Sequence, residues 1–323
     1  MGKEIAHPPS WRRWAGRLGS WWLAAVLLVA VLAKAADPIA FAEQLQLEGL
    51  TGPLAPQTAA LVALGIEAVL GLGLLLGLRH AGWLTAVSAL VVFFLAITAR
   101  GWWRAAHGLA DSAACGCFGN LLQRTPAEAF WQDLLLMAPA LALAWLGRAR
   151  FPHPAEATRW ALALGGAAAV VLLGWHAPQL PLDDLATRLA PGVEVARLCA
   201  GGEPQVCVGD VAPELLEGNH WVVLLDLEDD PAAWVDDLNA YVYDGGEPPL
   251  LALTASPPDR LQAFTWDWGP AFPVREAPAE LLRPLYRELP RSFLVEEGEV
   301  VVTSRGLPPQ ANGAAPGGDE EIE

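Results

Sequence analysis

The N-terminal half of the sequence contains five long apolar stretches, each with at most one Asp, Glu, Lys or Arg. They are Leu18–Ala36, Thr58–Leu78, Ala81–Thr98, Ala129–Gly147 and Trp160–Ala177. Each is close to the roughly 20 residues that an α-helix needs to cross the hydrocarbon layer of a membrane. Tryptophan residues lie near the ends of these stretches, as in the aromatic belts of membrane proteins. The pattern therefore predicts an α-helical membrane bundle of five spans.

The C-terminal half shows a different pattern, in which short apolar runs alternate with amphipathic segments. The expected strands are Trp221–Leu227, Leu250–Ala255, the edge strand Phe272–Val274, Ser292–Glu296 and Val300–Thr303. The expected helices run from Asp230-Pro231, an N-cap followed by proline, to about Tyr243, and then over Asp259–Phe264 and Pro278–Glu288. Strands and helices in this order, closed by a hairpin, predict a small α/β sandwich. Residues 307–323 are rich in Pro, Gly and acid, and we expect them to be disordered.

The formal net charge of −16 is divided unevenly between the two halves. Residues 1–176 contain 12 Lys/Arg and 9 Asp/Glu, a net of +3, whereas residues 177–323 contain 8 and 27, a net of −19. A domain this acidic does not bind nucleic acid or an anionic membrane surface by charge. It would instead attract a basic partner.

The placement of Lys and Arg predicts the orientation in the membrane. With the N-terminus inside, cytoplasmic segments hold eight basic residues: Lys3, Arg12, Arg13, Arg17, Arg79, Arg148, Arg150 and Arg159. The outer loops hold three, Arg100, Arg104 and Arg124, with Lys34 at the end of a span. This asymmetry predicts a multi-pass protein of the cytoplasmic (inner) membrane, with its N-terminus inside and its C-terminal domain extracytoplasmic. Residues 1–35 also resemble a signal peptide; its cleavage is an alternative that leaves the later topology unchanged.

Two charged residues within the apolar stretches are candidates for function. Glu67 lies near the middle of the second span, where a carboxylate is expensive and should face the bundle interior, protonated or paired. It could make a proton or quinone contact, or simply a hydrogen bond between helices. Lys34 could pair with an acid, but we expect it to extend to the membrane interface instead.

The four cysteines, Cys115, Cys117, Cys199 and Cys207, all lie outside the cytoplasm in this topology, where disulfides form and persist. A disulfide within Cys115-Gly116-Cys117 closes a very small ring, and such a bond is strained and easily reduced. Nearby arginines would lower the pKa values of the thiols. We therefore interpret Cys115 and Cys117 as a redox pair. The alternatives are a structural bridge from this loop to the other two cysteines, or a metal site, which Cys-x-Cys spacing does not favour.

Cys199 and Cys207 bracket a turn-rich stretch between two short apolar runs. A hairpin closed by its own disulfide is the simplest explanation. The alternative is a second redox pair that exchanges with the first. His107, eight residues before Cys115, is a further candidate base. The sequence offers no metal-binding motif.

Residues 18–148 resemble the MauE branch of the DoxX-like membrane proteins, which support methylamine-dehydrogenase maturation in methylamine utilisation. The matching residues are Lys34, Asp37-Pro38, Phe41, Glu67, Gly71 and the string Cys115-Gly116-Cys117-Phe118-Gly119. The resemblance implies a four-helix bundle that takes part in disulfide formation or electron transfer for exported proteins.

The C-terminal half is similar to thioredoxin-like domains. Leu289-Pro290 before Ser292–Leu294, followed by Glu297-Gly298, fits the loop that carries the cis proline of that family and its closing hairpin. The sequence departs from the family after the strand Trp221–Leu227. There it reads Glu228-Asp229-Asp230-Pro231, where an active Cys-x-x-Cys would lie. The resemblance thus implies a thioredoxin-like fold without its usual thiol chemistry, and a binding or docking role.

The sequence leads to five regions: a cytoplasmic basic N-terminus (1–17), a MauE/DoxX-like four-helix membrane domain (18–148), a fifth transmembrane helix (149–178), an extracytoplasmic thioredoxin-like domain (179–306) and an acidic tail (307–323). The leading hypothesis is a thiol-disulfide oxidoreductase of the membrane that exchanges electrons with an exported thiol or disulfide protein, with quinone as a plausible acceptor. The alternative is a non-enzymatic assembly or scaffold subunit with structural disulfides. A third hypothesis, a small-molecule transporter, is supported by Glu67 alone.

Overall fold

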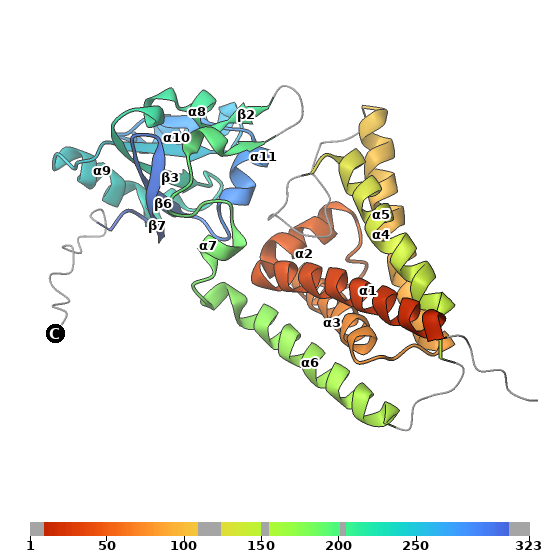
Figure 1. The fold of residues 1–323 in the computed structure, drawn as a ribbon. Coiled ribbons are helices and arrows are strands. Elements are labelled where there is room, and N and C mark those ends of the chain that lie inside the picture. The colour runs from red at the N-terminus through yellow and green to blue at the C-terminus, as the bar shows by residue number, and fades with distance from the viewer. Residues whose placement is uncertain (1–9, 109–123, 150–154, 201–204, 310–323) are drawn as a thin grey trace, which may run out of the picture. The chain divides into compact units, whose positions relative to one another are not determined.

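The computed structural model describes residues 10–108, 124–149, 155–200 and 205–309 (Figure 1). The chain divides into two compact units, Met1–Leu182 and Asp183–Glu323. The first contains helices and the second a mixed sheet with its own helices, and each is described here by itself. Most of the tail that the sequence predicts to be disordered, residues 310–323, lies outside the described residues.

Five helices in the described part of the first unit are long and apolar enough to cross a membrane. They are α1 (Ser10–Ala36), α3 (Pro56–Leu75), α4 (Ala81–Ala106), α5 (Pro126–Leu146) and α6 (Glu156–His176). This confirms the helical bundle of five apolar helices. A further short helix, α2 (Pro38–Leu47), follows α1 and was not expected. It begins at Asp37, whose side chain accepts a hydrogen bond from the backbone N–H of Ala40 at 3.0 Å, and Pro38 occupies its first turn.

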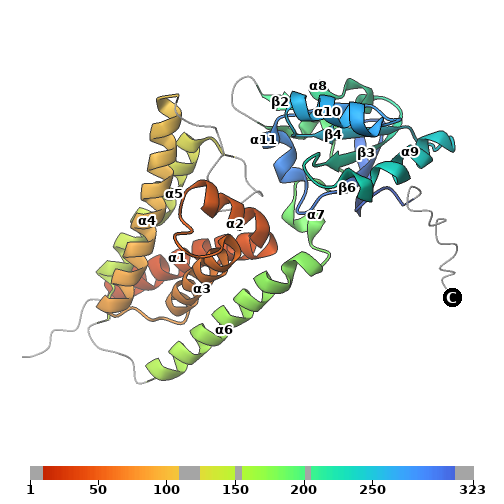
Figure 2. The ribbon, with the colours of Figure 1, turned by 180° about the vertical axis from the view of Figure 1, so that it is seen from behind.

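Helix α1 packs against α3 and α5, while α3 also packs against α6 and α4 against α5 (Figure 2). Leucine, valine and methionine side chains from α1, α3, α4 and α5 form the main apolar core of the bundle. Two glycines of α1 allow the backbones of α1 and α5 to approach closely. A Cβ added at Gly19 would lie 2.5 Å from the carbonyl oxygen of Ala140, and one at Gly16 would lie 2.5 Å from the Cα of Gly147. Small residues at a helix crossing are typical of membrane bundles.

The second unit is built on a five-stranded sheet in the order β5-β4-β3-β6-β7. Its strands are β3 (Asn219–Leu225), β4 (Leu250–Thr254), β5 (Val274–Glu276), β6 (Arg291–Glu296) and β7 (Glu299–Arg305). Strands β3, β4 and β5 are parallel, whereas β6 is antiparallel to both β3 and β7. Helix α9 (Val235–Tyr243) connects β3 to β4, and α10 (Pro258–Trp268) connects β4 to β5. This arrangement is thioredoxin-like and confirms the predicted fold class.

The central strands are buried on both faces. Val222 and Leu224 of β3 point into one apolar cluster together with Leu251 and Leu253 of β4. The alternate residues of both strands enter a second cluster, which also contains Trp234 and Phe264. Two-sided burial explains why these strands read as continuous apolar runs in the sequence.

The predicted elements differ from the structure mainly at their ends. The helix expected over Pro278–Glu288 is a short α11 (Ala279–Leu282) followed by a 3₁₀ turn, Arg283–Leu285. Pro284 lies within this stretch and has no N–H to continue an α-helical ladder. The helix expected after Asp230 begins as a separate 3₁₀ turn, Pro231–Ala233, before α9. The edge strand is shifted two residues towards the C-terminus.

An arginine cluster holds the start of the second unit, the short helix α7 (Asp183–Ala186), against the sheet. Arg291 of β6 is 2% exposed, and its guanidinium donates hydrogen bonds to Thr187 at 2.9 Å and to Asp184 at 3.2 Å. Arg287 and Arg305 both pair with Asp183. Burial lowers the pKa of Arg291, and the two aspartates oppose that shift. The first residues of the unit are therefore part of its fold.

We expect Gly19→Ala to destabilise the bundle, although alanine is the better helix former. The added methyl meets backbone atoms of α5, and overpacking of this kind costs about 1–3 kcal/mol. The midpoint of thermal unfolding in detergent should fall. Gly165→Ala on α6 is the matched control, because no atom lies within 4 Å of its added Cβ. An equal effect of the two substitutions would contradict the proposed crossing of α1 and α5.

Candidate functional site

Cys115 and Cys117, the predicted redox pair, lie outside the described residues. The structure does describe the helix ends on either side of their segment. Helix α4 ends at Ala106, and α5 begins after Thr125, whose side chain and that of Glu128 form a reciprocal capping box. The segment that contains both cysteines is thus bounded by two ordered helix ends.

Arg100 and Arg124, which flank this segment, are each paired with a carboxylate. Arg100 of α4 contacts Glu48, which follows α2. Arg124 donates to Asp133 at 3.2 Å and to Gln132 at 3.2 Å, and Asp133 is fully buried. Sequence reasoning did not anticipate this buried pair, because the partner of Asp133 lies nine residues away across the start of a helix. These carboxylates therefore offset the charges of the two arginines.

The main polar feature inside the helical bundle is an ion pair between Lys34 of α1 and Glu67 of α3. The Nζ of Lys34 lies 2.7 Å from one carboxylate oxygen of Glu67 and 2.8 Å from the other. Lys34 is 3% exposed and Glu67 is 2% exposed. Each charge is costly in an apolar bundle, and each removes most of the cost of the other by pairing within hydrogen-bond distance.

Aromatic rings enclose the same ammonium group. The Nζ of Lys34 lies 5.0 Å from the ring centre of Phe41 in α2 and 4.8 Å from that of Phe94 in α4. Both distances are within the range of cation–π attraction. One lysine thus contacts side chains from three other helices. The expectation that Lys34 extends to the membrane interface is wrong: an acid and two aromatic faces inside the bundle satisfy its charge.

His107, a candidate base, terminates α4. Its exposed ring nitrogen Nδ1 lies 2.7 Å from the carbonyl oxygen of Trp103, one turn earlier in the same helix. This contact caps the helix end. Among the described residues, which do not include the Cys115–Cys117 segment, no group of three His, Cys, Asp or Glu side chains could hold a metal ion.

In the second unit, acidic residues occupy the position where thioredoxin-like proteins carry thiols. The chain leaves β3 through Asp226 and Glu228, and the side chain of Asp230 caps the following turn by accepting from the N–H of Ala232. The Leu289–Pro290 peptide, before β6, is cis, at the position predicted for that family's proline. A cavity of about 150 Å³ lies at this end of the sheet. Its walls include Asp226, Ser256, Tyr286 and Leu289.

A small hydrogen-bond network lines this cavity. The hydroxyl of Ser256 is 3.1 Å from that of Thr254, and it accepts a hydrogen bond from the N–H of Leu227 at 3.1 Å. The carboxylate of Asp226 accepts from the N–H of Glu228 at 2.9 Å. Hydroxyl and carboxylate groups therefore lie at the end of the sheet where thioredoxin-like proteins carry thiols. Sequence reasoning recognised the missing thiols but not the contribution of Thr254 and Ser256, which come from the next strand.

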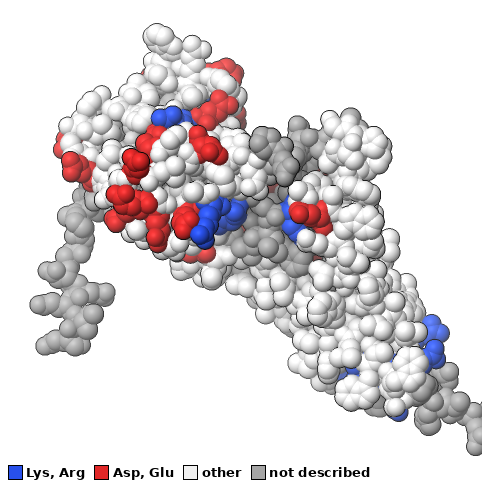
Figure 3. Space-filling model, turned by 45° about the horizontal axis from the view of Figure 1, so that its top comes forward, with Lys and Arg blue, Asp and Glu red and all other residues white. Residues whose placement is uncertain are grey.

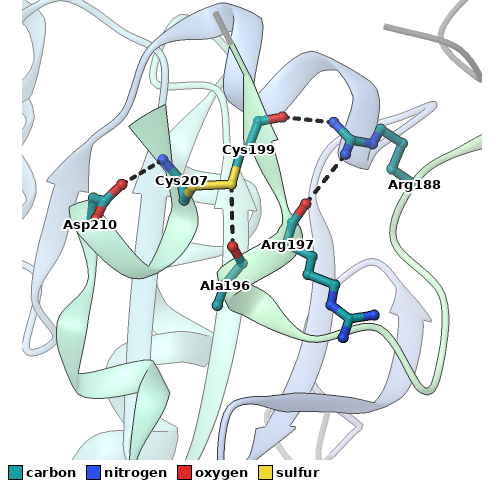
Figure 4. Close-up of a disulfide and its surroundings, with 6 residues drawn as sticks. All are labelled: Arg188, Ala196, Arg197, Cys199, Cys207 and Asp210. Carbon is teal, nitrogen blue, oxygen red and sulfur yellow. Dashed lines mark hydrogen bonds between the residues drawn. A yellow bond between two sulfur atoms is a disulfide. The ribbon is translucent and has the colours of Figure 1, made fainter. Parts of the chain in front are cut away.

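Cys199 and Cys207 form a disulfide across the hairpin of β1 (Cys199–Ala200) and β2 (Val206–Cys207) (Figure 4). The two residues are directly paired in the ladder, and both are half-buried. Arg188 donates to the carbonyl oxygens of Cys199 at 2.8 Å and Arg197 at 3.3 Å. Burial lowers the pKa of Arg188. The hairpin disulfide thus lies at the surface of the second unit, next to the guanidinium of Arg188, which these two hydrogen bonds hold in place.

Charge is distributed as the sequence predicts. In the view of Figure 3, acidic side chains are spread over the C-terminal unit, whereas the helices of the first unit present a mostly uncharged surface. Many large apolar side chains of the helices are exposed, among them Leu135, Val92 and Trp175. Exposed apolar side chains on helices of this length are what a lipid environment requires.

The fold and these features define a multi-pass membrane protein with a thioredoxin-like domain. Residues 12–146 match the model of the family described as methylamine utilisation protein MauE. This match covers α1 to α5 and contains Lys34, Glu67, Cys115 and Cys117.

No curated protein is a significant match to this chain. Among solved structures, the chain is similar to the bacterioferritin comigratory protein of Xanthomonas campestris, which was studied for alkyl peroxide reduction. The identity is 17%, the similarity covers 39% of this chain and 93% of that chain, and the TM-score is 0.27. This TM-score is too low to indicate a shared fold. The assignment of a thioredoxin-like fold to the C-terminal unit is therefore based on its strand order.

Removing one partner of the Lys34–Glu67 pair should destabilise the bundle strongly. Glu67→Leu alone or Lys34→Met alone leaves a buried charge without its partner, at a cost of about 3–5 kcal/mol. The paired substitution Lys34→Met/Glu67→Leu should recover most of this loss, because no charge remains. Unfolding of the full chain in detergent measures the difference. Glu194→Ala, which removes an exposed pair with Arg197, should change the unfolding free energy by less than about 1 kcal/mol.

Replacing both cysteines of the hairpin by serine should lower the stability of the second unit without unfolding it. The disulfide closes a short loop and lowers the conformational entropy of the unfolded chain, which stabilises the folded unit by about 2–3 kcal/mol. Hydrogen–deuterium exchange of the buried amides of β3 in the full chain reports this free energy. A change below about 0.5 kcal/mol would show that the disulfide adds no stability to the unit.

Proposed function

We propose that the protein is a membrane thiol–disulfide or electron-transfer protein of the MauE type, which supports disulfide formation or maturation of exported proteins. The observation that carries this proposal is the family match over residues 12–146, because it encloses Cys115-Gly116-Cys117 within a membrane bundle. Cys115 and Cys117 form the redox pair. On this proposal residues 18–148 are the four-helix redox domain, 149–178 the fifth span and 179–306 the extracytoplasmic domain that presents the partner.

The proposed reaction is thiol–disulfide exchange with an exported protein. A thiolate of the partner attacks the Cys115–Cys117 disulfide and forms a mixed disulfide, which the partner's second thiol resolves. The partner gains a disulfide, and Cys115 and Cys117 gain two electrons and two protons. A two-electron acceptor in the membrane then regenerates the pair.

Quinone is the acceptor class expected for such a membrane protein. Lys34 is a buried donor inside the bundle, but its ammonium is bonded to both oxygens of Glu67 and covered by Phe41 and Phe94. The two residues of this pair therefore do not fit a quinone site. The role that the contacts support for Lys34 and Glu67 is to hold α1, α2, α3 and α4 together.

Substituting one cysteine of the redox pair should trap the partner. In Cys117→Ser cells, the Cys115 thiolate can still attack the disulfide of an oxidised partner, which is the reverse of the proposed reaction. Cys117 can then no longer attack the resulting mixed disulfide, so this species should accumulate on non-reducing gels. Loss of disulfide formation in that partner should accompany it. Cys199→Ser/Cys207→Ser is the control and should trap nothing through Cys115. No mixed disulfide together with unchanged partner oxidation would sink this proposal.

The proposal places the N-terminus in the cytoplasm and the C-terminal domain on the outer side of the cytoplasmic membrane. The support is the excess of Lys and Arg in the loops that would face inwards. Alkaline phosphatase fused after Gly306 should therefore be active, whereas the same enzyme fused after Gly77, between α3 and α4, should be inactive. The reverse pattern of activities would contradict this orientation.

A second candidate function is a non-enzymatic assembly or scaffold subunit. The closed Cys199–Cys207 disulfide favours it, since this domain has acids where related domains carry thiols. A scaffold subunit predicts that alkylation of the unreduced protein finds all four cysteines permanently closed. A redox protein predicts a fraction of molecules in which Cys115 and Cys117 react.

A further inference from the structure

Each sulfur of the hairpin disulfide between Cys199 and Cys207 lies near a backbone group that can form a hydrogen bond with it. The side chain of Cys207 accepts a hydrogen bond from the backbone N–H of Asp210, three residues into the following turn, α8 (Val208–Val211). The Sγ of Cys199 lies 3.2 Å from the carbonyl oxygen of Ala196. A disulfide sulfur carries no proton, so this second contact is not a hydrogen bond while the disulfide is closed. It becomes one if Cys199 is a thiol.

These contacts distinguish the two sulfurs. An N–H donor stabilises a thiolate at Cys207, whereas a carbonyl oxygen favours a protonated thiol at Cys199. The carboxylate of Asp210 is held by the backbone N–H of Cys207 at 2.9 Å and opposes part of that effect. On the Cys199 side, the guanidinium of Arg188 lies against the backbone of the same residue (Figure 4). An approaching thiolate therefore meets a positive charge, Arg188, beside Cys199 and a negative charge, Asp210, beside Cys207.

The hairpin does not depend on the disulfide for its position. Leu198, Ala200 and Val208 are buried in the core beside the sheet, and Val206 packs against it. The N–H of Val208 donates to the carbonyl oxygen of Leu198 at 2.9 Å, and that of Val195 donates to Gly298 at 2.8 Å. Side chains and backbone would therefore keep the hairpin on the domain after the disulfide opens.

We propose that Cys199–Cys207 is an exchange-competent disulfide, which accepts electrons from an external dithiol protein by attack at Cys199. The partner's thiolate bonds to the Sγ of Cys199, the Cys199–Cys207 bond breaks, and its electron pair passes to Cys207 as a thiolate bonded to the Asp210 N–H. The partner's second thiolate then attacks the partner sulfur of the mixed disulfide and releases Cys199 as a thiolate. Cys199 takes up a proton and, as a thiol, donates a hydrogen bond to the carbonyl oxygen of Ala196. The partner dithiol is oxidised to a disulfide, and the hairpin disulfide is reduced by two electrons and two protons.

This inference goes beyond the proposed function, because it concerns the domain that lacks the usual thiols and does not require Cys115 or Cys117. It places a redox site about 20–30 residues before the position where a thioredoxin-like fold normally carries one. The partner is a protein with two reactive thiols and, given the net charge of −19 over residues 177–323, a basic surface.

The test uses the full chain in detergent with Cys115→Ser/Cys117→Ser, so that only the hairpin pair can react. The protein is equilibrated in glutathione buffers of graded ratio, quenched with acid, alkylated and mapped by mass. We expect the disulfide to open and close reversibly, with an unchanged circular dichroism spectrum. The mixed glutathione adduct should lie on Cys199 in about tenfold excess over Cys207, the effect of one hydrogen bond to a charged sulfur.

A disulfide that stays closed in every native buffer and opens only in denaturant would overturn the proposal. So would an adduct found mainly on Cys207. A matched pair of variants tests the donor: Asp210→Ala removes the carboxylate but keeps the N–H, whereas Asp210→Pro removes both. The excess of adduct on Cys199 should persist in the first and disappear in the second. Mapping of the parent protein decides the proposal if the proline variant does not fold.

Discussion

A lysine and a glutamate on different helices of an apolar bundle restrict how those helices can pack. Because Lys34 and Glu67 must lie within hydrogen-bond distance inside the bundle, the rotation and the height of α1 and α3 relative to each other are both fixed. The rings of Phe41 and Phe94 bring α2 and α4 to the same point. The ends of α4 and α5, between which the Cys115–Cys117 segment runs, are positioned by a bundle whose interior is organised around this one pair.

The sequence predicts most of this architecture for a simple physical reason: apolar length is a strong signal. All five long helices were expected, since no soluble core requires five such stretches in succession. Helix α2 was missed because ten residues give little periodicity, although Asp37-Pro38 is a recognisable start. The pairing of Lys34 with Glu67 was not predicted, because it depends on how two helices are rotated, and no local pattern encodes that rotation. The one sequence signal for it is that the two residues carry opposite charges in neighbouring apolar stretches.

In the C-terminal unit the sequence indicates the fold better than the site. The buried apolar strands β3 and β4 and the turn before β6 were predictable, because each depends on residues close in the chain. The cavity was not, because its walls come from the ends of two strands and from the connection that precedes β6. Asp226 and Ser256 are brought together by the register of parallel strands, thirty residues apart. The absence of thiols after β3 follows directly from the sequence, but the hydrogen bonds around Cys199 and Cys207 required the structure.

The enclosure of Lys34 also determines how the protein responds to its medium. The counter-ions of a salt solution weaken an attraction only where they can approach the charges, and the screening length at physiological ionic strength is about 8 Å of water. The pair between Arg100 and Glu48, where the arginine side chain is 48% exposed, is open to that screening. The pair between Lys34 and Glu67 is covered by phenyl rings and helix walls. The bundle interior should therefore keep its packing from dilute to concentrated salt, while polar contacts at its surface loosen.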